Sequence, residues 1–268
     1  MVDLNIENLS QPYNHVKITF LGTGTSQGVP LIGCTCQVCV STDPFDHRLR
    51  CALWIRTDTT SIIIDTGPDF RYQALRAKID RVDAVLFTHG HKDHVAGLDD
   101  IRAFNYWQQS AIDIYANECT SEVLHREFQY VFNDDKYPGI PQLDLHIINE
   151  TPLIIGDLEI IPIKVMHYKM EVYGYRIGKF TYITDANYID PNELKKIFGT
   201  EILVLNALRR EKHISHFTLE EAIQLSEQIN APQTYFTHIS HQLGLHKEVT
   251  WELQEGISLA YDGLTIEV

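Results

Sequence analysis

The segment Thr88-His-Gly-His-Lys-Asp-His94 is the feature that most constrains what this chain can fold into. It places three imidazoles and a carboxylate within six residues, directly after an apolar run at 84–87 that predicts a short buried strand. His89 and His91 are two residues apart, so in extended backbone their side chains point the same way. Asp93 and His94 lie just beyond, where the chain must turn. One segment can therefore direct two ligands at one metal ion and two at a neighbouring ion.

Three more polar residues each follow an apolar run that predicts a strand. His167 comes after the run at 160–165, Asp185 after the run at 180–183, and His238 after the run at 234–236. Strand ends are where a rigid scaffold presents functional side chains. A lone residue of this kind is usually a turn or core-edge residue, and the first motif alone could be a surface loop that binds metal adventitiously. Their joint occurrence predicts a metal site, and imidazole with carboxylate suits Zn²⁺, Mn²⁺ or Fe²⁺.

The five cysteines include a cluster, Cys34-Thr-Cys36-Gln-Val-Cys39, that resembles a metal site. The first eleven residues lack the pattern of a signal peptide, and no stretch approaches the ~20 apolar residues of a membrane span, so we expect a cytoplasmic protein with no membrane partner. Thiols stay reduced there, which favours metal binding over disulfides. Three thiolates are one ligand short of a tetrahedral zinc site. The alternative is three free thiols on a loop. By proximity in sequence, His47 is a candidate for the fourth ligand.

The remaining pattern alternates apolar β runs with helical stretches, which predicts a layered α/β or α+β architecture. No linker interrupts the 268 residues, so we expect one domain over 1–268 with a structural-metal loop at about 33–47. The segment 108–152 is the least regular. The net charge of −14 argues against a general nucleic-acid partner, although a bound metal can reverse the local field. The expected strands are 16–21, 51–56, 61–64, 84–87, 158–165, 173–177, 180–183, 202–205 and 234–236, and the expected helices are 69–77, 120–128, 191–197 and 218–229.

The pattern His89-x-His91-x-Asp93-His94, followed by His167, Asp185 and His238 in that order, is similar to the signature of the metallo-β-lactamase superfamily. The resemblance implies a four-layer αβ/βα sandwich and two catalytic divalent metal ions, Zn or Mn. It assigns His89, His91 and His167 to one ion and Asp93, His94 and His238 to the other. Asp185 would bridge both ions. Asp93 would also have a catalytic role in orienting the nucleophile.

A narrower resemblance rests on three segments: Gly22-Thr-Gly-Thr-Ser-Gln-Gly-Val-Pro30, the cysteine cluster, and Thr237-His-Ile-Ser-His-Gln242. Together they resemble the cyclic phosphodiesterases of bacterial phosphonate breakdown, which open a phosphoribosyl 1,2-cyclic phosphate. The resemblance implies that His238 binds a catalytic metal and that His241 completes one structural Zn with Cys34, Cys36 and Cys39. It also implies that His216 is a catalytic residue on the phosphate side.

These observations predict a metal-dependent hydrolase. The expected enzyme is a phosphodiesterase that opens a small cyclic or acyclic phosphate ester by attack of a metal-bridging hydroxide, with a small phosphorylated molecule as its substrate. An RNA-processing nuclease of the same superfamily and a non-catalytic metal-binding protein remain alternatives. A thioester or lactone hydrolase fits the cysteine cluster and His216 poorly. A homodimer is compatible with the sequence.

Overall fold

Two β-sheets face each other in the computed structural model, which describes residues 15–133 and 137–268. The first sheet has the order β15-β1-β2-β3-β4-β5-β6. Strands β1 and β2 pair antiparallel, whereas β3, β4, β5 and β6 run parallel to one another. The bounds are β1 Lys17–Gly22, β2 Ala52–Arg56, β3 Ser61–Ile64, β4 Ala84–Leu86, β5 Ile112–Ala116, β6 Leu143–Ile147 and β15 Thr265–Glu267.

The second sheet has the order β11-β8-β9-β10-β12-β13-β14, and β7 pairs with β8 outside this path. Strands β10, β12, β13 and β14 run parallel, so their carboxyl ends meet at the same edge of the sheet. Strand β8 also ends at that edge, because β9 pairs antiparallel with both β8 and β10. The bounds are β7 Leu153–Ile155, β8 Leu158–His167, β9 Met170–Ile177, β10 Phe180–Tyr182, β11 Tyr188–Ile189, β12 Ile202–Asn206, β13 Gln233–Thr237 and β14 Ile257–Leu259.

Alternation along the strands builds the layers. In β3, Ile62 and Ile64 enter the core between the two sheets, while Ile63 faces the helices on the outside. In β12, Val204 faces the other sheet while Leu203 and Leu205 face the second helical layer. Successive side chains of a strand point to opposite faces, so a strand that is apolar throughout must be covered on both sides. This is why the β runs read as continuous apolar segments.

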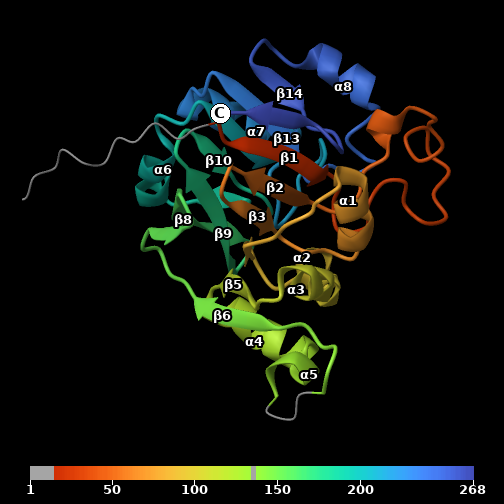
Figure 1. The fold of residues 1–268 in the computed structure, drawn as a ribbon. Helices are drawn as coiled ribbons and strands as arrows, with labels where there is room; N and C mark the ends of the chain where they lie inside the picture. Colours follow the sequence, from red (N-terminus) through yellow and green to blue (C-terminus); the bar gives the residue numbers. More distant parts are fainter. Residues whose placement is uncertain (1–14, 134–136) are drawn as a thin grey trace, which may run out of the picture.

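Helices cover the outer face of each sheet, as Figure 1 shows. Residues of α1 to α4 share a core with the first sheet, and residues of α6 to α8 share one with the second. The αβ/βα sandwich expected from the sequence is therefore confirmed. Helix α7 begins with a capping box, in which the side chains of Thr218 and Glu221 each accept from the other residue's backbone N–H. The helices are α1 Phe70–Ala77, α2 Lys92–Val95, α3 Arg102–Gln108, α4 Glu118–Glu127, α5 Gln129–Phe132, α6 Pro191–Ile197, α7 Leu219–Ile229 and α8 His246–Glu252, with short 3-10 turns η1 Pro44–Asp46 and η2 Leu98–Ile101.

The structure differs from the sequence expectation in two places. The segment 108–152 is more regular than expected, because β5 and β6 pair and extend the first sheet. Along the chain, α4, which matches the expected helix at 120–128, and α5 connect the two strands (Figure 1). Asp93 and His94 lie in the short helix α2 rather than in a turn. Within the described ranges, no helix is long and apolar enough to cross a bilayer.

Candidate functional site

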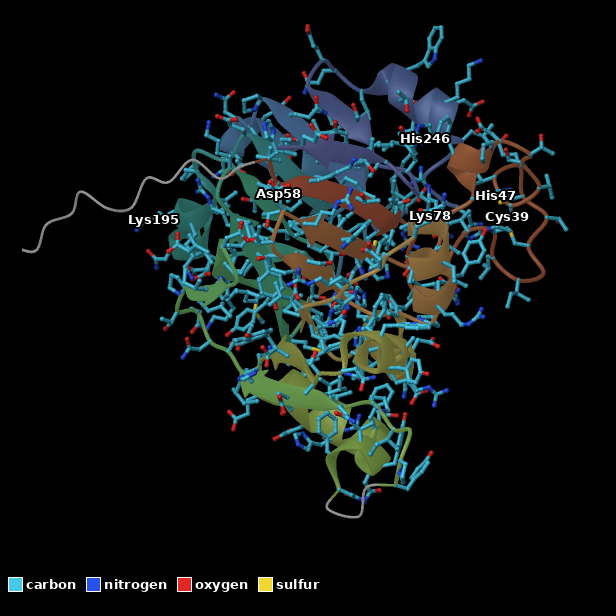
Figure 2. All side chains as sticks on the ribbon, viewed as in Figure 1. Cys39, His47, Asp58, Lys78, Lys195 and His246 are labelled. Atoms are coloured by element: carbon cyan, nitrogen blue, oxygen red, sulfur yellow. The ribbon has the colours of Figure 1, made fainter. Side chains whose placement is uncertain are left out.

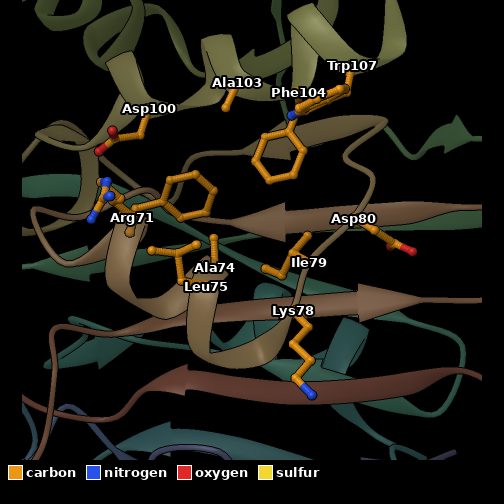
Figure 3. A pocket seen from close by; sticks show the side chains of 11 residues that line it. Arg71, Ala74, Leu75, Lys78, Ile79, Asp80, Asp100, Ala103, Phe104 and Trp107 are labelled. Carbon is orange, nitrogen blue, oxygen red and sulfur yellow. The ribbon is translucent and has the colours of Figure 1, made fainter.

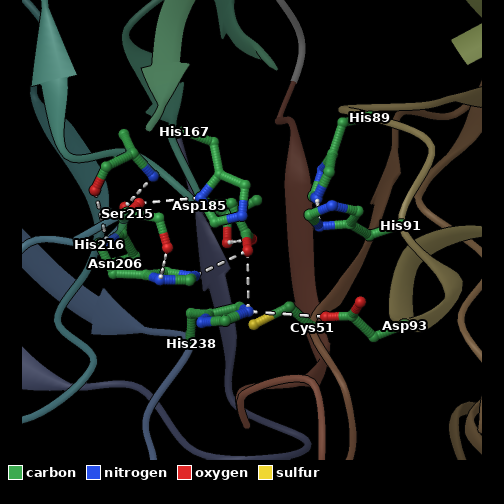
Figure 4. Close-up of polar contacts among 12 residues, drawn as sticks. Cys51, His89, His91, Asp93, His167, Asp185, Asn206, Ser215, His216 and His238 are labelled. Atoms are coloured by element: carbon green, nitrogen blue, oxygen red, sulfur yellow. Dashed lines mark hydrogen bonds and ion pairs between the residues drawn. The ribbon is translucent and has the colours of Figure 1, made fainter. Parts of the chain in front are cut away.

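Three imidazoles form the first group of candidate metal ligands. His89 and His91 follow β4 on the first sheet, and His167 ends β8 on the second, so the group spans the gap between the sheets (Figure 4). One ring nitrogen of each lies within 4.8 Å of the others. His89 Nε2 and His91 Nδ1 are 3.0 Å apart. His89 and His167 are buried and His91 is exposed, so this group opens to solvent on the His91 side.

Asp93, His94, Asp185 and His238 form the second group, again with ligand atoms within 4.8 Å of one another. His94 Nε2 lies 3.1 Å from Asp93 Oδ2 and 3.2 Å from Asp185 Oδ2. His238 Nε2 lies 3.1 Å from Asp185 Oδ1. Asp185 also lies within the same reach of His167, a member of the first group. The carboxylate of Asp185 is therefore placed between the two groups.

A buried carboxylate that the sequence analysis did not identify orients the second group. Asp65 follows β3, and its Oδ2 accepts from His94 Nδ1 at 2.7 Å. Asp65 Oδ1 accepts from the backbone N–H of Thr88, and Oδ2 also accepts from the Thr88 hydroxyl, both at 2.8 Å. Because Nδ1 of His94 is used in this way, its Nε2 is left for a metal. Asp65 follows the apolar run Ile62-Ile63-Ile64, so it meets the strand-end criterion that identified the ligands.

Asn206, at the end of β12, holds the backbone next to Asp185. Its Oδ1 accepts from Ala186 N–H at 2.8 Å and its Nδ2 donates to the Ala186 carbonyl at 3.0 Å. Asp185 has φ 53, a left-handed conformation that costs energy for a residue other than glycine. The two hydrogen bonds hold the chain in this conformation. Thr184 adds a third restraint by donating its hydroxyl to Asp185 Oδ2 at 2.7 Å.

The electrostatics of the second group are those of buried carboxylates facing imidazoles. Burial lowers the pKa of His94, but the charges of Asp93, Asp185 and Asp65 outweigh it and raise that pKa well above its ordinary value. Burial also lowers the pKa of His238, but the charge of Asp185 outweighs burial and raises that pKa to about 9. Without a cation, these imidazoles take up protons to balance the carboxylates. The site therefore concentrates negative charge that a divalent ion can neutralise.

The unpaired nitrogens of the second group test whether a metal fits. His94 Nε2 and both ring nitrogens of His238 are buried without a hydrogen-bond partner among the described residues. The Nε2 atoms of His94 and His238 approach carboxylate oxygens closely, yet neither is aligned as a hydrogen-bond donor. Buried nitrogen atoms are rarely left unpaired, because each loses its hydration without compensation. Nitrogen and oxygen atoms that converge in this way fit a divalent ion.

His216 lies beside both groups but outside the seven residues expected as ligands. Its Nε2 is 3.0 Å from Asp185 Oδ1, and its ring stacks on His238 with centroids 4.8 Å apart. Its Nδ1 contacts Ser215 Oγ and His213 Nδ1, both at 3.1 Å. With His167 and Asp185, it forms a third group of atoms close enough to hold an ion. The structure thus places His216 where it could contact either a substrate or a metal.

The cysteine cluster lies on the loop between β1 and β2 and meets His241. His241 Nδ1 is 3.4 Å from Cys34 Sγ and 3.3 Å from Cys36 Sγ, and Cys39 completes a group within 4.8 Å. The contact with His241 lowers the pKa of Cys36 to about 6, while burial raises that of Cys39 to about 11. His47 is not in this group, because it is exposed and bonds the Ser41 carbonyl. Figure 2 shows Cys39, His47 and His246 on this side of the molecule.

The glycine-rich segment connects the cysteine loop to the metal groups. Gly24 pairs with Ile239, the residue after His238, and the Thr25 N–H donates to the Ile239 carbonyl. A Cβ on Gly22 would lie 1.9 Å from the Arg50 carbonyl oxygen, so only glycine permits this approach. Gly22 therefore allows the backbones of the two segments to approach each other closely.

An apolar hollow of about 690 Å³ lies elsewhere, between α1, η2 and α3 (Figure 3). Phe70, Ala74, Ile79 and Phe104 contribute to its wall, and none of the candidate ligands does. Groups able to hold a metal or transfer a proton are gathered at the sheet edge instead. The hollow is therefore not the site of the chemistry.

Comparison with known proteins identifies the family. Residues 60–239 match the family described as the beta-lactamase superfamily domain. A crystal structure of a diphosphatase from the PhnP family superposes with a TM-score of 0.90 and 42% sequence identity, covering 95% of this chain and 97% of that one. The chain therefore belongs to the metallo-β-lactamase superfamily and is a metal-dependent hydrolase.

Curated relatives are longer proteins. An octanoyltransferase of Porphyromonas gingivalis is 41% identical over 252 residues, which are 93% of this chain and 51% of that protein. A ribonuclease Z of Nostoc punctiforme is 26% identical over 61% of this chain and 47% of that protein. The chain thus spans about half the length of these relatives.

We predict that Asn206→Asp lowers the affinity for the catalytic metals by about 10–100-fold, as expected when a group that supports a ligand is lost. The new carboxylate still accepts from Ala186 N–H but repels the Ala186 carbonyl, which releases the backbone at Asp185. Elemental analysis after dialysis against metal buffers measures the loss. Asn105 is the matched control, because its side-chain amide makes the same pair of hydrogen bonds, to the backbone of Gln142, away from the metals. Asn105→Asp should lower the melting temperature without loss of metal, and equal metal loss in both variants would contradict the role of Asn206.

Proposed function

We propose that this chain hydrolyses a small phosphate ester or anhydride at a centre that holds two divalent metal ions. His89, His91 and His167 would bind one ion, Asp93, His94 and His238 the other, and Asp185 would bridge them. The observation that carries the proposal is the position of Asp185, whose carboxylate lies within 4.8 Å of the ligand atoms of the second group and of His167 in the first. The likeness to a PhnP-family diphosphatase over nearly the whole of both chains supports the phosphate substrate.

Two divalent ions at such a centre lower the pKa of a water and neutralise charge that develops on a phosphate ester. The protein's own residues supply the rest. Asp93 is only partly buried, so one of its oxygens can orient the attacking water while the other faces His94. His216 lies on the opposite side of Asp185 from Asp93 (Figure 4), where it can contact the phosphate or protonate the leaving oxygen.

A nuclease is the second candidate, since ribonuclease Z and the exodeoxyribonuclease WalJ of Streptococcus pneumoniae are relatives at 26% and 28% identity. The net charge of −14 disfavours a long polyanion. The octanoyltransferase of Porphyromonas gingivalis is about twice as long as the segment of it that matches this chain. We assign hydrolysis, rather than acyl transfer, to the part that corresponds to this chain.

We expect the metal-loaded protein to hydrolyse bis(p-nitrophenyl) phosphate, and Asp185→Asn to remove nearly all of this activity. Asparagine keeps the shape of the side chain and tolerates left-handed backbone, so the charge alone is tested. A steady-state assay should include precursor tRNA, single-stranded DNA and an octanoyl thioester, with Asp190→Asn, an exposed residue that caps α6, as the control. Wild-type kcat and metal content in Asp185→Asn would refute the bridging role. Faster turnover of a nucleic acid than of any small ester would favour the nuclease.

His216→Ala should keep its metals, lose activity strongly on an alkyl phosphodiester and lose less on a p-nitrophenyl ester. A positioned acid accelerates departure of a poor leaving group by roughly 10²–10⁴-fold, and p-nitrophenolate needs little such help. Comparing kcat on the two substrates, with exposed His146→Ala as the control, measures the difference. Equal losses would favour phosphate binding, and loss of metal would make His216 a ligand.

We also propose that Cys34, Cys36, Cys39 and His241 hold one structural zinc ion. Three thiolates and an imidazole match a tetrahedral structural site, and the site would tie the loop after β1 to the segment that carries His238. Cys36→Ser should release about one zinc per chain and lower the melting temperature, because structural zinc contributes to folding free energy. Exposed Cys119→Ser lies outside the cluster and should change neither. An unchanged zinc content in Cys36→Ser would rule out the site.

A further inference from the structure

A second hollow, of about 370 Å³, lies where the outer face of the first sheet meets the end of α1. Four cationic side chains line it: Lys17 on β1, Arg56 on β2, Arg76 on α1 and Lys78 just after α1. Among the described residues, none that lines it carries a carboxylate, although acidic residues outnumber basic ones by 36 to 22 in this chain. The charge of this hollow is therefore opposite to that of the whole protein.

Lys17 and Arg56 face each other directly across the pairing of β1 with β2. Like charges in opposite positions of two strands repel and lower stability. Neither residue forms an ion pair within the described parts of the chain, and Lys78 forms none there either. Glu267 is the neighbour of Lys17 on β15, but it too makes no ion pair with the lysine among these residues. An anion in the hollow would relieve the repulsion.

Arg56 is held ready for such an anion. Its guanidinium lies over the Trp54 ring at 4.7 Å from the centroid. The ring itself is fixed, since Trp54 is buried and its Nε1 donates to Ser61 Oγ at 2.9 Å. Stacking fixes the plane of the guanidinium and leaves its N–H groups free. An immobilised fork of donors matches the geometry of phosphate oxygens.

The two cations of the helix side complete the hollow. Arg76 donates to the Leu21 carbonyl at 2.5 Å and lies 3.4 Å from Asp262, so its charge is partly balanced. Lys78 ends α1 in a left-handed conformation. In Figure 3 its side chain leaves the apolar hollow and points toward the strands, and Figure 2 shows the same residue at the end of the helix. Lys78 thus lines the same hollow as Lys17 and Arg56.

We propose that this hollow binds a small phosphorylated anion at a site separate from the metal centre. No lining residue of the hollow belongs to the groups of candidate metal ligands, and Lys17, at the start of β1, lies roughly 17 Å along the strand from Gly22. The volume falls in the range of about 300–1,000 Å³ that small-molecule sites occupy. The ligand is a free phosphate or the phosphate of a nucleotide, since both present the same oxygens.

Calorimetric titration of the metal-loaded protein tests the site, with inorganic phosphate and AMP as separate probes in 0.15 M salt. Wild type should bind two phosphates per chain, one at the metals and one in the hollow. The double variant Lys17→Gln/Arg56→Gln should lose one of them, with affinity at the hollow reduced at least about tenfold. Its turnover of bis(p-nitrophenyl) phosphate without added anion should equal that of wild type. Tighter binding of AMP than of phosphate to the hollow would identify a nucleotide.

Two further variants make the outcome decisive. Glu267→Gln removes the negative charge next to Lys17 and should tighten binding to the hollow. Lys195→Gln removes an exposed cation on α6, away from the hollow, and should change nothing. Phosphate should also raise the melting temperature of wild type more than that of the double variant, which reports on the site independently of calorimetry. Equal phosphate binding by wild type and the double variant would overturn the proposal.

Discussion

The structure depends on the meeting of buried carboxylates and imidazoles at the edge shared by the two sheets. Asp65, Asp185 and His94 are almost fully excluded from solvent, and Asp93 is half-buried beside them. Burial of an isolated charge costs several kcal/mol, and only good partners offset it. Hydrogen bonds satisfy Asp65, which accepts from Thr88 and His94. His94 Nε2 and the ring nitrogens of His238 have no such partner among the described residues, and a bound cation would supply one.

Backbone strain gathers at the same edge. Asp65, Asp185 and His238 have φ values of 64, 53 and 55, in the left-handed region that residues other than glycine seldom adopt. Such conformations persist only where neighbours hold them. Asn206 clamps the chain after Asp185, while the Gly24 bridge and the hydrogen bond from Ile239 N–H to the Thr23 carbonyl restrain the chain after His238. The supporting residues are thus as specific to the site as the ligands that they hold.

Site residues with a distinctive type and position could be predicted from the sequence. Residues whose role depends on a distant hydrogen-bond partner could not. The seven proposed metal ligands lie in four segments that follow or end predicted strands, and they come in a recognisable order. Asp65 and Asn206 stand at strand ends too, but a carboxylate or amide there is ambiguous until its partner is seen. Proximity in sequence suggested His47 for the cysteines, whereas the family resemblance indicated His241, about two hundred residues away, which makes the contact. The alternation of apolar and polar residues in β5 does not stand out within 108–152, because the segments on either side of it are polar and aromatic.

The charge distribution explains how an acidic chain can act on phosphate. Screening limits the reach of a surface charge to about 8 Å at physiological salt, so a small anion responds to the local field rather than to the net charge. Under the proposed function, local fields become favourable where cations collect: at the metals, and in the hollow of Lys17 and Arg56. A small phosphorylated molecule fits within one such region. A long polyanion must also cross surface whose average charge is negative, and each additional phosphate outside the cationic region opposes binding. The same chain can therefore concentrate small phosphates at defined places and still disfavour extended nucleic acid.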